Sequence, residues 1–177
     1  MKRVMIVGQP GSGKSTLASM LGKATGLPVF HMDKIHWMEG WVMRPDPDRL
    51  RMAMAVEDGE AWIFEGGFSR TYDRRRDRAD TLIWLATPFA LRVWRVTWRF
   101  VRDFGKTRPD MADGCPEGNF REMIDFYRFI WRSRNTSKAR IERLIAEAAP
   151  DLDVHVLHSA RDVADFVKAA HARTARG

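Results

Sequence analysis

The sequence has one cysteine and no long hydrophobic run. With Cys115 as the only thiol among 177 residues, the chain can form no internal disulfide and no four-cysteine metal site. None of its apolar runs is long enough to span a bilayer. Met1 to Arg3 lead straight into the first apolar segment, which leaves no room for a signal sequence. We therefore expect a cytoplasmic protein without a membrane partner.

The composition is typical of a water-soluble globular protein. Hydrophobic residues make up 45% of the chain and charged residues 30%. The length is that of one domain, so we expect residues 1–177 to fold as a single unit. The 30 lysines and arginines exceed the 23 aspartates and glutamates, and the net charge is +7. This excess favours anionic partners, either nucleotides or nucleic acids, without separating the two classes.

A glycine-rich segment follows the first apolar stretch, Val4 to Val7. It matches the phosphate-binding loop pattern G-x-x-x-x-G-K-[ST] at every required position, and an expected helix begins after it. Glycines let backbone amides converge on an anion, to which a helix N-terminus adds partial positive charge. Lys14 is expected to reach the β and γ phosphates of ATP, and the Ser15 hydroxyl to ligate Mg²⁺; the alternative is an ordinary glycine turn. The expected nucleotide-binding residues are Gly8, Gln9, Pro10, Gly11, Ser12, Gly13, Lys14, Ser15 and Thr16.

Asp33 stands at the end of the second expected strand, residues 27–32. In an open α/β sheet, ligands bind beyond the carboxyl ends of the strands, which places Asp33 near the phosphate loop. A carboxylate there can orient an acceptor hydroxyl, hold a water of the metal or act as a base. Alternatively, Asp33 caps a short helix that begins at Lys34. His36 and Trp37 follow closely and are expected to contact the substrate.

A second carboxylate, Glu65, ends the third expected strand, residues 61–64. Gly66 follows it and permits close approach of the backbone to a ligand, so both residues are expected at the substrate site. The alternative is a glycine turn with a solvated glutamate. Arg70 lies nearest to this strand end among the five arginines of residues 69–79, and it is predicted to contact the substrate. The other four arginines are expected to face solvent.

An expected helix over residues 89–104 follows a fourth strand at residues 81–85. At about 100° per residue, its four arginines share an arc of about 80°, with apolar residues on the opposite side. This basic stripe is either aimed at an anion or a solvated helix face. The long irregular segment 105–119 is typical of an active-site lid, and Arg108 is its candidate functional residue. The arginines of the stripe are Arg92, Arg95, Arg99 and Arg102.

The remaining sequence predicts two further helices, a fifth strand and a last helix. Helical spacing covers the segments from residue 119 or 120 to 132 and from 136 to 149, and residues 154–157 form the strand. Ser159 and Asp162 form a capping box for the last helix. Strands that alternate with helices after a phosphate loop predict a doubly wound parallel sheet.

On these motifs the chain resembles the nucleoside-monophosphate-kinase-like branch of the P-loop proteins. More narrowly, it resembles the adenylate-kinase-related family often labelled DNA topology modulation proteins. The residues that carry the narrower resemblance are segments 8–16, 31–37, 40–41, 62–66, 107–112 and 114–117, with Pro88, Arg95 and Arg99.

The resemblance implies an α/β P-loop NTPase fold: a five-stranded parallel sheet in the order 2-3-1-4-5, helices on both faces and a mobile helical lid in one kinase-like domain. It also implies ATP at the phosphate loop and a second site for a phosphoryl acceptor. Arg95, Arg99 and Arg108 match the lid-side arginines that neutralise charge on the transferring phosphoryl group. Two positions depart from the usual pattern. Residues 65–68 stand where Asp-Gly-Asn-Tyr is common, and Ala86 stands where the fourth strand often ends in aspartate.

The sequence favours an ATP- and Mg²⁺-dependent kinase for a small molecule, with a nucleoside monophosphate as the first acceptor to test and a hydroxylated metabolite as another. The rival hypothesis is a nucleotide-binding regulator that contacts DNA or a protein partner, and a third is plain NTP hydrolysis. Nucleic-acid binding is less favoured, because the sequence has no helix-turn-helix signature, zinc finger or basic tail. The oligomeric state stays open. The predicted catalytic residues are Lys14, Asp33, Arg95, Arg99 and Arg108, and the predicted metal ligand is Ser15.

Overall fold

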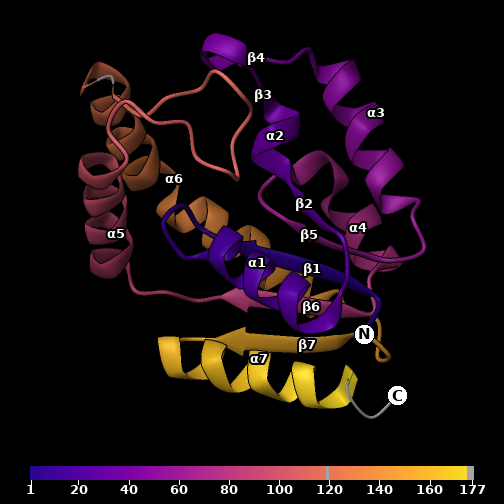
Figure 1. The fold of residues 1–177 in the computed structure, drawn as a ribbon. Helices are drawn as coiled ribbons and strands as arrows, with labels where there is room; N and C mark the ends of the chain where they lie inside the picture. Colours follow the sequence, from indigo (N-terminus) through magenta and orange to yellow (C-terminus); the bar gives the residue numbers. More distant parts are fainter. Residues whose placement is uncertain (119, 175–177) are drawn as a thin grey trace.

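The computed structural model describes residues 1–118 and 120–174, and its centre is a parallel sheet of five strands (Figure 1). The order across the sheet is β2-β5-β1-β6-β7. Counted along the chain, these five strands have the predicted order 2-3-1-4-5; the labels differ because a two-stranded hairpin, β3 and β4, lies between β2 and β5. The strands are β1 (Arg3–Gly8), β2 (Val29–His31), β3 (Trp37–Met38), β4 (Val42–Met43), β5 (Trp62–Glu65), β6 (Thr81–Leu85) and β7 (Asp153–Leu157).

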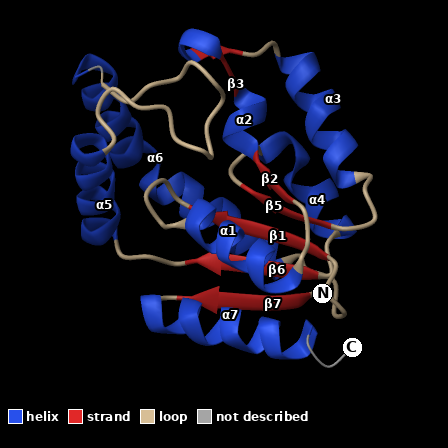
Figure 2. Ribbon diagram, in the orientation of Figure 1, coloured by secondary structure: helices blue, strands red, loops and turns tan. Residues whose placement is uncertain are grey.

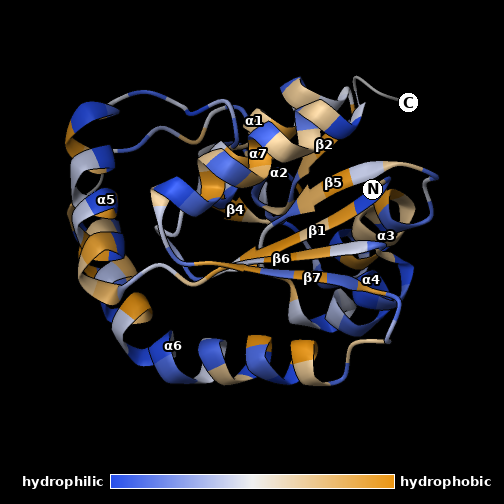
Figure 3. Ribbon diagram, turned by 90° about the horizontal axis from the view of Figure 1, so that it is seen from below, coloured by the Kyte–Doolittle hydropathy of each residue, from blue (hydrophilic) through white to orange (hydrophobic). Residues whose placement is uncertain are grey.

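Helices cover both faces of the sheet (Figures 2 and 3). Helices α1 and α7 pack together on one face, and α3, α4 and α6 lie on the other. This three-layer arrangement confirms the predicted fold class. The helices are α1 (Lys14–Thr25), α2 (Met32–His36), α3 (Asp46–Glu57), α4 (Tyr72–Arg78), α5 (Phe89–Arg102), α6 (Phe120–Ala146) and α7 (Ala160–Thr174), with 3₁₀ turns η1 (Glu39–Trp41) and η2 (Ser69–Thr71).

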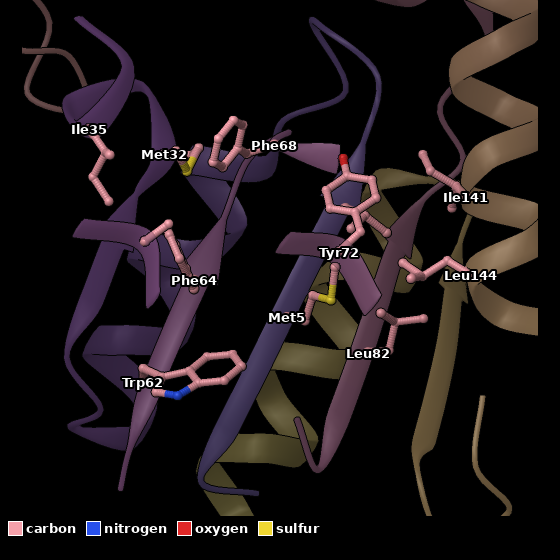
Figure 4. Packing of buried hydrophobic residues seen from close by; sticks show 12 residues of the cluster. Met5, Met32, Ile35, Trp62, Phe64, Phe68, Tyr72, Leu82, Ile141 and Leu144 are labelled. Atoms are coloured by element: carbon pink, nitrogen blue, oxygen red, sulfur yellow. The ribbon is translucent and has the colours of Figure 1, made fainter. Parts of the chain in front are cut away.

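The central strand β1 is buried on both faces. Its four apolar residues, from Val4 to Val7, are fully buried and point alternately to the two sides of the sheet. A strand covered by helices on both faces needs such an uninterrupted apolar run. On the side of α6, Ile141 and Leu144 point toward Leu82 of β6 (Figure 4). The sheet is therefore a rigid platform whose carboxyl ends carry the phosphate loop.

The predicted pair of helices after the lid is one helix, α6, which runs from Phe120 to Ala146. The predicted break at residues 133–135 was wrong, because this segment holds no glycine or proline to interrupt the backbone ladder. Ser133 instead donates its hydroxyl to the Phe129 carbonyl at 2.6 Å, within the same helix. Asn119, the earlier of the two predicted start positions, lies outside the described residues.

The predicted lid spans residues 105–118 of the described chain, and within this range it holds no helix. Two isolated bridges, Phe104 with Glu117 and Thr107 with Pro116, close it into a narrow loop. The prediction of a helical lid was therefore wrong for the segment itself. Its support is helical, since α5 precedes the loop and α6 follows it (Figure 1). Among the described residues, no helix is long and apolar enough to cross a membrane.

Candidate active site at the phosphate loop

The phosphate loop joins β1 to α1 and is shaped by its glycines. Gly11 and Gly13 have φ angles of 77° and 98°, a left-handed region that favours glycine. A Cβ on Gly11 would lie 2.5 Å from the Arg92 carbonyl oxygen of α5. Gly13 caps α1 without any side-chain hydrogen bond, so no side chain occupies the amide groups of the first helical turn. Those amides lie where the sequence predicts an anion site.

Lys14 and Ser15 begin α1, directly beside the loop. The Lys14 ammonium donates to the Gln9 carbonyl at 3.4 Å, which keeps it folded over the loop. The Ser15 hydroxyl donates to Glu65 Oε1 at 3.0 Å. Thr16 follows on the exposed side of the first turn. The two residues with the most specific predicted roles therefore lie between the loop and the end of β5.

Glu65 is buried, with 2% of its surface exposed, so the alternative of a solvated glutamate was wrong. Besides Ser15, it contacts His31, whose Nδ1 lies 2.8 Å from Glu65 Oε1. His31 and Glu65 are register partners on the neighbouring strands β2 and β5. Gly66 follows with φ 109°, and a Cβ there would lie 2.6 Å from Met32 Cβ. Glycine is therefore required at position 66, because the segments that follow β2 and β5 pack together there.

Asp33 lies in the first turn of α2, next to this cluster. The helix begins at Met32 with His31 as its N-cap and has no side-chain cap, so Asp33 is not the cap residue that the alternative required. Burial raises the pKa of Asp33, and the negative charge of Glu65 raises it further, while Lys14 and Arg108 oppose the shift. Three carboxylates, those of Asp33, Glu65 and Asp110, and two cations thus interact at one edge of the sheet.

The basic stripe of α5 points inward, toward the phosphate loop. Arg92 is 3% exposed and donates to the Pro10 carbonyl, and Arg95 donates to the Ser12 carbonyl at 3.0 Å. Much of the opposite, apolar side faces solvent: Trp94 and Trp98 are 60% and 55% exposed, although Phe100 is buried. The alternative of a solvated basic face was therefore wrong for these arginines. It holds for Arg102 at the end of the helix, which is exposed and pairs with Asp103.

The lid loop brings Arg108 into the same cluster. Arg108 pairs with Asp110 at 2.7 Å and with Glu117 at 3.1 Å, and Arg99 of α5 lies 3.3 Å from the same Glu117. Burial alone would raise the pKa of Asp110, but the positive charge of Arg108 and the nearby Ser15 hydroxyl bring it below its usual value. Arg99 and Arg108 therefore share a carboxylate partner near the phosphate loop.

Three predicted substrate contacts have other neighbours. Arg70 is largely exposed and pairs at 2.6 Å with Asp46, the first residue of α3. His36 lies edge-on against Phe68, and Trp37 packs its ring against a second tryptophan of the hairpin, Trp41. Burial, with the nearby positive charges of Arg49 and Arg75, lowers the pKa of His36 to about 4. The roles of Arg70, His36 and Trp37 toward an acceptor stay predictions.

The sequence analysis missed several partners of the site. His31, Asp110 and Glu117 each contact a predicted site residue, yet none was chosen. Arg75, predicted to face solvent, is fully buried, and this prediction was wrong. A signal was available, because Tyr72 and Arg75 lie three residues apart on the buried side of α4.

The site offers oxygen ligands that fit Mg²⁺. The Ser15 hydroxyl and the Glu65 carboxylate are hard oxygen donors in mutual contact. Mg²⁺ commonly keeps several waters and binds substrate phosphates, so one or two protein oxygens suffice. Across residues 1–118 and 120–174, no group of three or more histidines, cysteines, aspartates and glutamates is arranged to hold a metal ion. The residues thus fit a nucleotide-bound Mg²⁺ better than a metal centre made of protein ligands alone.

Comparison with known proteins finds that the chain is similar to small-molecule kinases. No protein-family profile matches it. A shikimate kinase of Rhodococcus jostii (strain RHA1) is 25% identical over 154 residues, which cover 79% of this chain and 88% of the relative. Among solved structures, a shikimate kinase from Bacteroides thetaiotaomicron has a TM-score of 0.58 at 16% identity and covers 97% of each chain.

Two other kinases have a similar structure. A deoxyadenosine kinase from M. mycoides has a TM-score of 0.56 at 14% identity, covering 98% of both chains. A gluconokinase from Sinorhizobium meliloti 1021 has a TM-score of 0.51 at 16% identity, covering 99% of this chain and 92% of the other. At such identities the solved structures show the fold alone. The chain has the P-loop, nucleoside-monophosphate-kinase-like fold that the motifs predicted.

Proposed function

We propose that this chain is an ATP-dependent kinase that transfers the γ-phosphoryl group of ATP to a hydroxyl group of a small metabolite. The curated relative is a kinase that covers most of both chains. The similar proteins are named as kinases of hydroxylated compounds: shikimate kinase, deoxyadenosine kinase and gluconokinase. This pattern favours a hydroxylated metabolite over the nucleoside monophosphate that the sequence ranked first.

The observation that carries the proposal is the Ser15 hydroxyl, held 3.0 Å from the Glu65 carboxylate inside a phosphate loop. Ser15 and Glu65 would hold Mg²⁺. When bound, Mg²⁺ would offset the negative charge of the phosphates. Lys14 and the amides at the start of α1 bind the phosphates. The protein has little covalent chemistry to perform in such a transfer, so positioning and charge decide the rate.

The remaining predicted residues are assigned to the acceptor and to the transferred group. Asp33 orients the acceptor hydroxyl and accepts its proton, because it is a partly buried carboxylate beside Lys14. Arg95, Arg99 and Arg108 neutralise the charge that develops on the phosphoryl oxygens. All three already lie around the phosphate loop, on α5 and on the lid. The lid would close over the bound nucleotide and exclude water.

The narrower family assignment is also a proposal. The motifs of the lid and of residues 31–37 resemble those of the DNA topology modulation proteins. The segment from α2 through the β3–β4 hairpin contacts the lid: the Gly40 amide donates to the Gly114 carbonyl at 2.9 Å. Membership in this group would describe ancestry and would leave the acceptor open.

The acceptor side of the proposal is tested with a panel of small hydroxylated acids, deoxynucleosides and nucleoside monophosphates. The purified protein is incubated with Mg²⁺ and ATP, and phosphorylated acceptor is detected by mass. In Asp33→Asn, we expect kcat to fall by about 10²-fold or more with unchanged ATP affinity, because the base and orienting group is lost. Asp48→Asn on α3 is the exposed control. Equal kcat in Asp33→Asn and the wild type would remove Asp33 from the mechanism.

The regulator hypothesis has a distinct outcome in the same experiment. Tight ATP binding without phosphorylation of any acceptor would favour it over the kinase. DNA affinity that falls steeply with salt would then be the next observation to seek, because contacts to phosphate groups release counterions.

A further inference from the structure

A buried arginine lies behind the candidate site. Arg75 of α4 and Glu57 of α3 are both fully buried, and Arg75 Nε lies 3.1 Å from Glu57 Oε1. The guanidinium also lies over the ring of Phe64, 3.8 Å from its centroid. Buried ion pairs are weak evidence of stabilisation, since well-packed apolar residues often serve as well in their place. The burial of an arginine here therefore needs a reason other than stability, and the contacts that only a guanidinium group can make supply one.

Those contacts reach both strand ends that carry the candidate carboxylates. Arg75 Nη1 donates to the Gly66 carbonyl at 3.1 Å, directly after Glu65. Nη2 donates to the Thr71 hydroxyl at 3.0 Å and lies 3.8 Å from Met32 Sδ, directly before Asp33.

The two strand ends also depend on each other and on the phosphate loop. Gly66 packs so closely on Met32 that a Cβ has no room, and its amide donates to the Ile6 carbonyl of β1. β1 leads directly into the phosphate loop. A shift of the Gly66 carbonyl would therefore move Glu65 relative to Ser15, which lies in the first turn of the helix after that loop.

We propose that Arg75, oriented by Glu57, is a positioning residue that sets Glu65 against Ser15 and Asp33 for phosphoryl transfer. One planar group with several donors can hold the Gly66 carbonyl, the Thr71 hydroxyl and Glu57 at once. Lysine has a single nitrogen and cannot reproduce this arrangement. This inference rests on the proposed function, from which it takes the roles of Glu65, Ser15 and Asp33.

The test replaces the ion pair by apolar side chains in the double variant Glu57→Met with Arg75→Met. Thermal unfolding reports whether the core stays intact, and kinetics with the best acceptor report kcat and the KM for ATP. We expect folding to persist, kcat to fall at least tenfold, and the KM for ATP to stay within twofold. Arg74→Met is the matched control, because Arg74 also pairs with Glu57 but is 34% exposed, and it should keep wild-type kcat.

A second measurement does not need turnover. ATP affinity is measured with and without Mg²⁺, and the gain on adding Mg²⁺ reports the Ser15 and Glu65 geometry. We expect the double variant to lose most of that gain while its Mg²⁺-free affinity stays within twofold of the wild type. A wild-type protein that phosphorylates no acceptor would overturn the proposed function, and this measurement would still decide the role of Arg75.

Arg75→Lys decides the question if the double variant does not fold. This substitution keeps the positive charge opposite Glu57 and removes the planar guanidinium group with its several donors. A folded Arg75→Lys with at least tenfold lower kcat and a reduced Mg²⁺ gain supports the positioning role. The positioning role of Arg75 would be overturned if either folded variant kept the wild-type kcat and the wild-type increase in ATP affinity on adding Mg²⁺.

Discussion

At the scale of single residues, His36 shows how burial controls charge near the site. Its ring lies edge-on against Phe68 at 5.3 Å between centroids, and its Nε2 has no hydrogen-bond partner among the described residues. Burial, followed by the positive charges of Arg49 and Arg75, lowers its pKa to about 4. His36 is therefore neutral in the folded protein at neutral pH, whereas in the unfolded chain its pKa is that of a free imidazole, about 6.5.

This difference predicts an acid-sensitive contribution to stability. Between pH 6.5 and about 4 the unfolded chain binds a proton at His36 that the folded chain does not, so stability falls as the pH falls through this window. Because the ring is partly solvated, we expect only about 1 kcal/mol between pH 7 and pH 5. Denaturant unfolding of His36→Gln should show a shallower pH dependence than the wild type. His158→Gln, exposed, is the control, and equal slopes in all three proteins would refute the assignment.

The sequence was sufficient to predict where single residues of the site lie, but not which other residues they contact. Asp33 and Glu65 follow apolar strand segments, and the carboxyl ends of parallel strands meet at one edge, so the sequence places both near the phosphate loop. The contact of Glu65 with His31 depends on the register of β2 against β5, which no local pattern reveals. Arg75 was misassigned because its charge suggested solvent, while its neighbours Phe64 and Glu57 come from other elements.

At the scale of elements, the phosphate loop and α5 are packed against each other. The arginine face of α5 covers the loop, and the backbone carbonyl of Arg92 lies where a side chain on Gly11 would be. The sequence predicted the basic stripe but left its direction open, because a period of 3.6 residues identifies two faces without saying which one is buried. Here Arg92 is buried together with Val96 and Phe100, while Trp94 and Trp98 lie outside.

Gly11→Ala tests this packing. The new Cβ would meet the Arg92 carbonyl oxygen at 2.5 Å at a φ of 77°, so α5 and the loop must separate. We expect a loss of about 3 kcal/mol in unfolding free energy, from backbone strain and the steric clash together, and weaker ATP binding. Gly26→Ala, with a φ of 73° and nothing within 4 Å, is the matched control and should cost only the strain of about 1–2 kcal/mol. Equal losses in denaturant unfolding would contradict the packing argument.

At the scale of the whole molecule, the lid joins two regions that are distant in sequence. Glu117 links it to α5 through Arg99, and Trp41 of the β3–β4 hairpin donates its indole N–H to the Pro116 carbonyl at 3.0 Å. The sequence indicated a lid from the length of the irregular segment. Its bridge to the hairpin is a long-range contact, which the length alone does not reveal.

Trp41→Phe should loosen the lid without unfolding the protein. It keeps an aromatic ring beside Trp37 but removes the hydrogen bond to Pro116, worth about 1 kcal/mol. We expect amide exchange of Met111 and Glu117 to accelerate about fivefold, the factor that corresponds to 1 kcal/mol. Trp98→Phe, on the exposed side of α5, is the control. Unchanged exchange in Trp41→Phe would show that this hydrogen bond does not hold the lid.

The most direct test of the central claim is Mg²⁺-dependent ATP turnover with the best acceptor in Lys14→Ala, compared with Lys23→Ala. Both lysines belong to α1, but Lys14 folds over the phosphate loop and Lys23 lies exposed in the last turn. We predict that Lys14→Ala loses at least about 10²-fold in kcat/KM, since the charge on the transferred phosphates is no longer offset, and that Lys23→Ala keeps wild-type activity. Full turnover and ATP binding in Lys14→Ala would contradict the assignment of the phosphate loop as the site that binds ATP for phosphoryl transfer.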